Sequence, residues 1–135
     1  HRIEILLNLL GEILQVSGVT GHIYRQYDVE DAAIVSLAFE SGACGIVSVI
    51  RGGTSEKDTL FIQGTRGTIA AEELNKGLLQ ITTAEGCRKE KWPPHKNFHQ
   101  PLIENFIQII EENRSFAVNG QVGLKVHDII AAIYE

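Results

Sequence analysis

Cysteine, proline and tryptophan are scarce in this 135-residue chain, which contains two, three and one of them. No apolar run approaches the roughly 20 residues needed to span a bilayer, and no basic segment precedes a short apolar core. We therefore expect neither a membrane span nor a signal peptide. Cys44 and Cys87 lie far apart, so free thiols in a cytoplasmic protein are the expectation. Cys44 lies in an apolar strand pattern, where we expect it to pack as a small hydrophobic side chain.

Positive charge is also in deficit, because 17 acidic residues outnumber 12 lysines and arginines and give a net charge of −5. Nucleic acids and anionic membranes favour basic surfaces, so we expect neither as a partner. The apolar fraction of 44% and the charged fraction of 21% are those of an ordinary globular protein. The length predicts a single domain over residues 1–135.

The chain begins with helical periodicity and continues with strands. The apolar residues Ile3, Leu6, Leu7 and Leu10 share one helix face, and Gly11 can end this helix. Residues 13–24 predict one bent strand or two short ones. Further strand patterns cover residues 32–39, 44–50, 59–63, 68–71, 78–83 and 87–92. Because short turns join most of these segments, neighbouring strands should be antiparallel.

Two more helices are predicted after the strands. One begins at Pro101, a residue that suits the first turn, and the other covers about 121–134 with Asn119 as its cap. We expect their apolar stripes to comprise Leu102, Ile103, Phe106, Ile107 and Ile110 on the first, and Leu124, Ile129, Ile130 and Ile133 on the second. This order predicts an α+β fold, with an open, predominantly antiparallel sheet and helices packed on one face.

Several predicted strands are apolar on both faces. In residues 44–50, Val47 and Val49 point to one side of the sheet, and Ile46 and Ile50 point to the other. Helices on one face cover only one of these sets, so the other face requires a second partner. We expect a homo-oligomer, a dimer or a tetramer, that forms through the open sheet face.

Motifs for phosphate or metal binding are weak. Residues 64–67, Gly-Thr-Arg-Gly, lie between two strands rather than before a helix, so they predict a hairpin turn and not a dinucleotide-binding turn. His95 and His99 are four residues apart, but they lie between prolines and have no evident third ligand, so we expect no metal site. Glu30 and Asp31 precede a strand, where we expect them to accept hydrogen bonds from backbone N–H groups.

Five segments in order resemble the C-terminal domain of the Gfo/Idh/MocA oxidoreductases, the relatives of glucose–fructose oxidoreductase and inositol dehydrogenase. The segments are HRIE, YDVEDAAIVSLAFESGACGIVSVI, FIQGTRGTI, PLIENFIQII and VNGQVGLKVHDIIAAIYE. The resemblance covers nearly the whole chain. It implies a fold like the C-terminal domain of glyceraldehyde-3-phosphate dehydrogenase, which supplies substrate contacts and the oligomer interface.

The resemblance also implies the cofactor and the substrate class. An N-terminal Rossmann domain, absent from this chain, would bind NAD or NADP in the full-length protein, and we expect no cofactor to bind this chain. The substrate would be a small molecule such as a sugar, a polyol or a related hydroxyl compound. The chain alone should be inactive, because the hydride chemistry belongs to the cofactor.

Two residues at the start of the chain resemble the second half of the family motif D-x-G-x-H-x-x-D. His1 matches the histidine, and Glu4 replaces the final aspartate with a longer carboxylate. The resemblance implies that His1 is catalytic and takes or relays the proton of a substrate hydroxyl, a task that suits imidazole near neutral pH. Glu4 is a weaker candidate for substrate binding. The alternative for His1 is a frayed surface residue at the start of a helix.

Two functions of different classes remain open from the sequence. The first is the C-terminal part of an NAD(P)-dependent oxidoreductase that acts on a sugar, a polyol or a related hydroxyl compound. The second is a free-standing, non-catalytic binding or oligomerisation module. A strand and a G-x-G-x-x-G turn encoded upstream of His1 would support the first, whereas a start codon directly before His1 would support the second.

Overall fold

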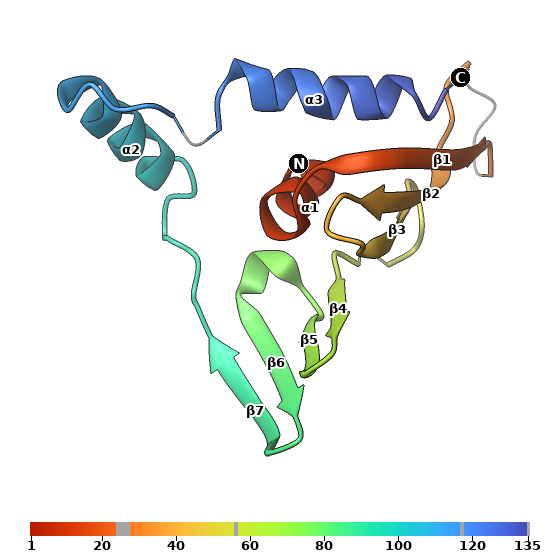
Figure 1. The fold of residues 1–135 in the computed structure, drawn as a ribbon, viewed down its shortest axis with the longest axis horizontal. Coiled ribbons are helices and arrows are strands. Elements are labelled where there is room, and N and C mark those ends of the chain that lie inside the picture. Colours follow the sequence, from red (N-terminus) through yellow and green to blue (C-terminus); the bar gives the residue numbers. More distant parts are fainter. Residues whose placement is uncertain (24–27, 56, 117, 135) are drawn as a thin grey trace. The chain divides into compact units, whose positions relative to one another are not determined.

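The computed structural model describes residues 1–23, 28–55, 57–116 and 118–134, and within them the chain forms two compact units. The first unit comprises His1–Gly53 and Phe116–Glu135, and the second comprises Thr54–Ser115. The first unit contains α1 (Arg2–Leu10), β1 (Ile13–Gly21), β2 (Ala32–Phe39), β3 (Cys44–Ile50) and α3 (Gly120–Ala131) (Figure 1). The strand predicted over residues 13–24 is therefore continuous as far as Gly21, and its last residue lies outside the described ones.

The second unit is a meander of short strands followed by a helix. Its elements are β4 (Leu60–Gly64), β5 (Gly67–Ala71), the short 3₁₀ helix η1 (Leu74–Lys76), β6 (Leu78–Thr83), β7 (Gly86–Lys91) and α2 (Gln100–Glu111). Among the described residues, the strands form one sheet in the order β1-β2-β3 and another in the order β4-β5-β6-β7, with antiparallel neighbours in both. The predicted α+β class with antiparallel strands is confirmed.

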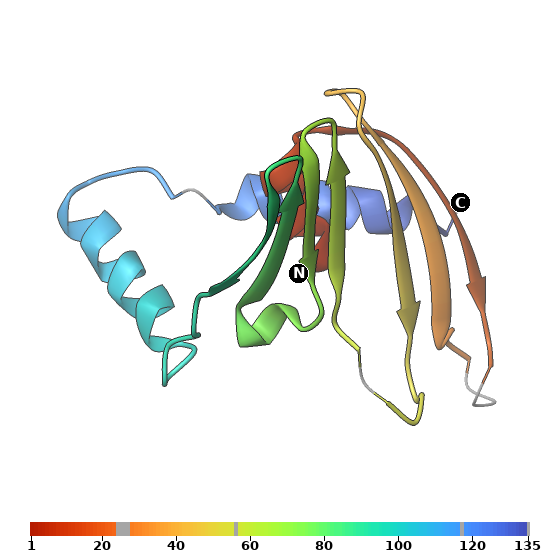
Figure 2. The same cartoon turned by 90° about the horizontal axis from the view of Figure 1, so that it is seen from below.

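The core of the first unit lies on one face of the β1-β2-β3 sheet. Val35, Leu37 and Phe39 alternate along β2 and are buried. In the antiparallel register, Val35 lies between Gly18 of β1 and Val47 of β3. Figure 2 shows these three strands side by side. Helices α1 and α3 and the turn that follows α3 cover this face through the partly buried side chains Leu6, Leu10, Ile129 and Ile133.

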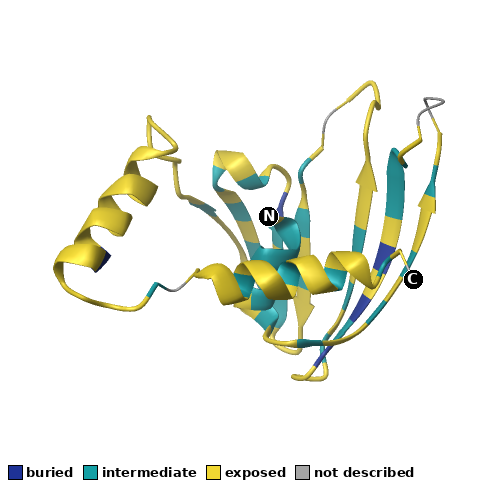
Figure 3. Cartoon of the chain, turned by 90° about the horizontal axis from the view of Figure 1, so that it is seen from above, coloured by how far each residue is buried: buried dark blue, intermediate teal, exposed yellow. Residues whose placement is uncertain are grey.

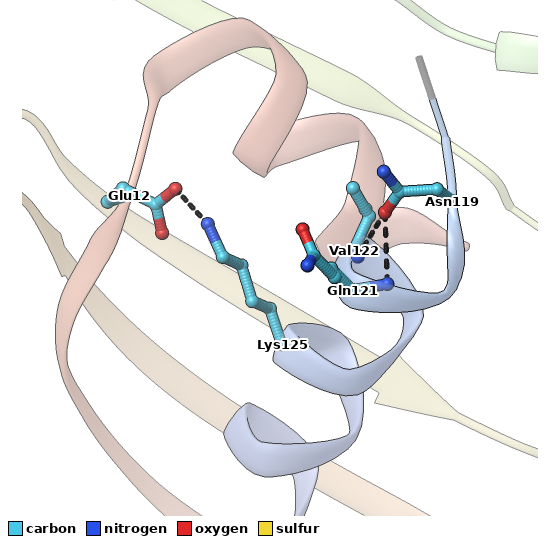
Figure 4. A network of polar contacts seen from close by, with 5 residues as sticks. All are labelled: Glu12, Asn119, Gln121, Val122 and Lys125. Carbon is cyan, nitrogen blue, oxygen red and sulfur yellow. Dashed lines mark hydrogen bonds and ion pairs between the residues drawn. The ribbon is translucent and has the colours of Figure 1, made fainter. Parts of the chain in front are cut away.

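Helix α3 lies close to β1 and is tied to the start of that strand. A Cβ atom at Gly18 would lie 2.7 Å from Cγ2 of Ile133, so glycine permits this approach. The Lys125 ammonium pairs with the Glu12 carboxylate, which lies between α1 and β1 (Figure 4). The predicted cap is confirmed, because Oδ1 of Asn119 accepts hydrogen bonds from the backbone N–H groups of Gln121, at 2.9 Å, and Val122, at 3.2 Å.

Replacing Asn119 with Ala should lower the free energy of unfolding by about 1 kcal/mol, because two N–H groups at the start of α3 lose their acceptor. Urea unfolding measured by circular dichroism would test this. Asn119→Asp is the matched control, since it keeps an oxygen acceptor and should retain most of the stability. Equal destabilisation by Ala and Asp would contradict the capping role.

Two residues predicted to face inward from α3 do not. Leu124 is 60% exposed and Ile130 is 39% exposed. The half-buried residues of α3 are instead Val122, Val126 and Ile129, and Ile133 in the turn after the helix continues the series. Their spacing of four, three and four residues follows one helix face. Apolar residues occur on more than one side of this helix, so packing against the sheet decided which of them lie inward.

The opposite face of the β1-β2-β3 sheet is apolar and exposed, as expected from the sequence. We call Val19, Ile34, Ile46 and Ile50 the open face, because in the strand register they lie opposite to the buried β2 residues. Their exposed fractions are 74%, 61%, 77% and 58% in that order. Figure 3 colours the strands by how far each residue is buried. Cys44 also lies on this side and is exposed, so the expectation that it packs inside is wrong. Both Cys44 and Cys87 are free thiols, as predicted.

Helix α2 begins at Gln100, with Pro101 in its first turn as predicted. Its predicted apolar stripe is exposed rather than packed, and the buried residue of this helix is Ile109 instead. Among the residues that the structure describes, no helix combines the length and the apolar character that crossing a membrane would require.

Candidate functional site

His1 lies at the N-cap position of α1, where its carbonyl oxygen accepts a hydrogen bond from the N–H of Ile5 at 3.1 Å. Its side chain makes no capping hydrogen bond and is exposed. The imidazole is therefore not engaged in holding the helix it precedes. A ligand that approaches the N-terminus of α1 would meet this side chain.

Glu4 lies in the first turn of the same helix and is half-buried. Because residues three positions apart are neighbours on a helix surface, His1 and Glu4 share one side of this turn. The structure therefore places both predicted residues at the N-terminal end of α1. A carboxylate in a first turn also interacts favourably with the helix dipole, which gives Glu4 a stabilising role beside any ligand contact.

The C-terminal half of α1 anchors the turn that carries these residues. Leu6 and Leu10 pack against the buried cluster of β2. At the end of the helix, Gly11 adopts a φ of 91° and its N–H donates to the carbonyl of Leu7 at 3.0 Å. The Ser41 hydroxyl donates to the carbonyl of Leu10 at 2.9 Å. A helix fixed in this way holds its first turn on a rigid support, as a binding site requires.

The other histidine candidates do not converge on a site. His95 is held locally, with its Nδ1 atom 2.9 Å from the carbonyl oxygen of Asn97, and His99 is the N-cap residue of α2. Within the described part of the chain, no group of three or more metal-ligating side chains occurs.

Glu30 and Asp31 both have structural roles. Asp31 Oδ1 accepts a hydrogen bond from the backbone N–H of Ile23 at 2.6 Å, as expected. Glu30 accepts a hydrogen bond from the Tyr134 hydroxyl and, as expected, one from a backbone N–H group. The hydrogen bond between Glu30 and Tyr134 is the main reason why the pKa of Glu30 is lowered and the pKa of Tyr134 is raised from their ordinary values. Local spacing contains no signal for this pair, because its members lie at opposite ends of the unit's sequence.

Residues 64–67 form a hairpin turn, as predicted, in which Gly64 pairs with Gly67 between β4 and β5. A Cβ atom at Gly67 would lie 2.1 Å from the carbonyl oxygen of Thr82, so this glycine is needed for close packing of β5 on β6. A dinucleotide-binding turn instead precedes the N-terminus of a helix. This turn therefore does not fit a pyrophosphate group.

The α+β architecture, with antiparallel sheets and the helices α1, α2 and α3, is that of the C-terminal domain of a class of oxidoreductases. The sequence model described as the GFO/IDH/MocA C-terminal domain matches residues 1–70, and the chain belongs to this family. The uncharacterized oxidoreductase YrbE of Bacillus subtilis (strain 168) is 27% identical over 110 residues, which cover 76% of this chain and 32% of YrbE.

Solved structures share the fold. An oxidoreductase from Agrobacterium radiobacter, in complex with NAD⁺, L-tartaric acid and magnesium, has a TM-score of 0.85 and 20% identity, with 99% of this chain and 44% of that chain covered. UDP-N-acetylglucosamine 3-dehydrogenase from Acidithiobacillus ferrooxidans has a TM-score of 0.83 and 20% identity, with 98% and 45% covered. The chain thus spans about a third of YrbE and less than half of either solved chain.

Proposed function

We propose that this chain is the substrate-side domain of a longer NAD- or NADP-dependent oxidoreductase that acts on a hydroxyl group of a sugar, a polyol or a related compound. The observation that carries the proposal is the family match over residues 1–70, which includes α1 with His1 and Glu4. The similar solved proteins support the substrate class and the cofactor, since one is a UDP-N-acetylglucosamine dehydrogenase and another was crystallised with NAD⁺.

In this proposal His1 is the catalytic base. Its exposed imidazole hydrogen-bonds to the reacting hydroxyl of the substrate and takes the proton as the alcohol becomes a carbonyl. Imidazole suits this task because it exchanges protons near neutral pH. The dinucleotide, bound by another part of the full-length protein, supplies the hydride acceptor. Glu4, on the same side of the turn, accepts a hydrogen bond from a second hydroxyl of the substrate and orients it.

The open face suggests how the protein assembles. Val19, Ile34, Ile46 and Ile50 form an exposed apolar surface, and monomeric proteins rarely leave large contiguous surfaces of this kind in water. A second copy related by a two-fold axis would place the same surface on itself and close the contact. We therefore include in the proposal a homodimer, or a tetramer built from such dimers, that forms through the open face.

The full-length protein should bind NAD or NADP and reduce it in the presence of a sugar or polyol substrate, whereas the 135-residue chain should bind neither dinucleotide measurably. The reason is that the hairpin at residues 64–67 packs on β6 and cannot hold a pyrophosphate. Calorimetry on both proteins and a screen of hydroxyl substrates, followed by the absorbance of reduced nicotinamide, would test this. Micromolar dinucleotide binding by the 135-residue chain would contradict the domain assignment.

A further inference from the structure

Helix α2 exposes a row of large apolar side chains that the proposed reaction does not use. The α2 stripe is defined here as Leu102, Ile103, Ile107 and Ile110, and their exposed fractions are 68%, 55%, 49% and 59% in that order. Their spacing keeps them on one side of a helix of 12 residues. Figure 3 colours most of α2 as exposed.

The opposite side of α2 is suited to water. Gln100 donates a hydrogen bond to Glu104 at 2.7 Å, and Gln108 donates one to Glu112 at 2.9 Å. These side chains follow each other at intervals of four residues, so they form a continuous polar ridge along the helix. The helix is thus amphipathic, with a solvated ridge on one side and an uncovered apolar stripe on the other. Such a stripe is the usual mark of a surface that packs against another element.

We propose that the α2 stripe docks on the dinucleotide-binding part of the full-length protein and so connects the cofactor side of the enzyme with its substrate side; this inference rests on the proposed function. The chain covers 44% and 45% of two solved relatives, so more than half of each relative lies outside the matching region. That remaining length is ample for a separate domain, since domains usually contain about 100–150 residues.

The size of the stripe favours a partner in the same polypeptide over a second copy. A helix of 12 residues is about 18 Å long, at a rise of about 1.5 Å per residue. A stable contact between separate proteins usually buries about 1,200 Å² or more in total, which a pair of such stripes cannot readily provide. A tethered partner acts at an effective concentration in the millimolar range, so a smaller contact is enough. The open face, in contrast, extends over β1, β2 and β3 and suits the second copy.

Hydrogen exchange followed by mass spectrometry on the full-length protein and on the 135-residue chain tests this proposal. Backbone amides of residues 103–110 should exchange about a hundredfold more slowly in the full-length protein, because docking blocks local opening of α2. In the full-length protein, the double substitution Ile103→Asp and Ile110→Asp should abolish most of this difference. Asn105→Asp, on the polar side of the same helix, and Leu124→Asp, at an exposed position of α3, are the matched controls and should preserve it.

If the α2 amides exchange at the same rate in the unmodified full-length protein and in the unmodified 135-residue chain, the proposal is wrong. This comparison needs no substitution. Protection that grows with protein concentration and accompanies association would also overturn the proposal, in favour of a second copy. Calorimetry with NAD and NADP separates this inference from the proposed function. A full-length protein that binds neither dinucleotide contradicts the function, whereas an unprotected α2 in a protein that does bind one contradicts only the docking.

Discussion

Replacing His1 with Ala in the full-length enzyme should lower kcat by about a hundredfold, because the substrate hydroxyl loses the group that takes its proton. The folded state should tolerate the change, since the His1 side chain is exposed and makes no capping hydrogen bond. Steady-state kinetics with a substrate found by screening would measure the effect. The loss should appear mainly in kcat and less in KM, because the imidazole acts on the reacting proton.

His127→Ala is the matched control, because His127 is exposed on α3 and has no part in the proposed reaction. Its kcat should remain that of the unmodified enzyme. Glu4→Gln should have a smaller effect than His1→Ala and should raise KM, since an amide still contacts a hydroxyl but without charge assistance. An unchanged kcat for His1→Ala would leave His1 as the residue that begins α1 and nothing more.

Lysine on the two faces of β3 should have opposite consequences. Val47 pairs with the buried Val35 on the face that α1 and α3 cover, so Val47→Lys should destabilise the fold by about 3 kcal/mol or more. Ile46 pairs with Ser36 on the open face and is 77% exposed. Ile46→Lys should therefore leave the fold intact and convert the oligomer into a monomer, because the second copy would have to bury an unpaired ammonium group.

Thermal unfolding and sedimentation together distinguish these outcomes. Val49 pairs with Ala33 on the covered face, but its side chain is 53% exposed. Lysine at Val49 is therefore a weaker test of core packing than lysine at Val47. Leu124→Lys, at an exposed position of α3, is the control and should change neither stability nor association. If the unmodified chain sediments as a monomer at tens of micromolar, the proposed contact through the open face is wrong.

Most of the secondary structure was predictable because the signals are local. In β2, alternate apolar residues mark one buried face, and the turn at residues 40–43 joins β2 to its neighbour β3. The end of α1 at Gly11 and the cap of α3 at Asn119 also follow from residues within one helical turn. The alternation of β3 further separated Val47 from Ile46, although it did not show which of the two faces the helices would cover.

The inward sides of the later helices were not predictable in the same way. Helix α3 has apolar residues on several sides, so its periodicity admits more than one stripe. Contact with the buried β2 cluster selected Ile129 and Ile133 and left Leu124 exposed. For α2 the stripe itself was recognised, but periodicity describes only the helix and not whether another element lies against it. Only the structure shows that the α2 stripe is exposed.

In the candidate site, too, local spacing predicted one feature and only the tertiary structure showed the other. The spacing of His1 and Glu4 places them at the N-cap and in the first turn of α1, and helix geometry alone thus predicts that they are neighbours. The tertiary structure decided what supports that turn. The pair between Lys125 and Glu12 and the hydrogen bond between Tyr134 and Glu30 each join residues more than 100 positions apart. Such partners meet only after the chain has folded, because nothing in the local sequence of either residue specifies the other.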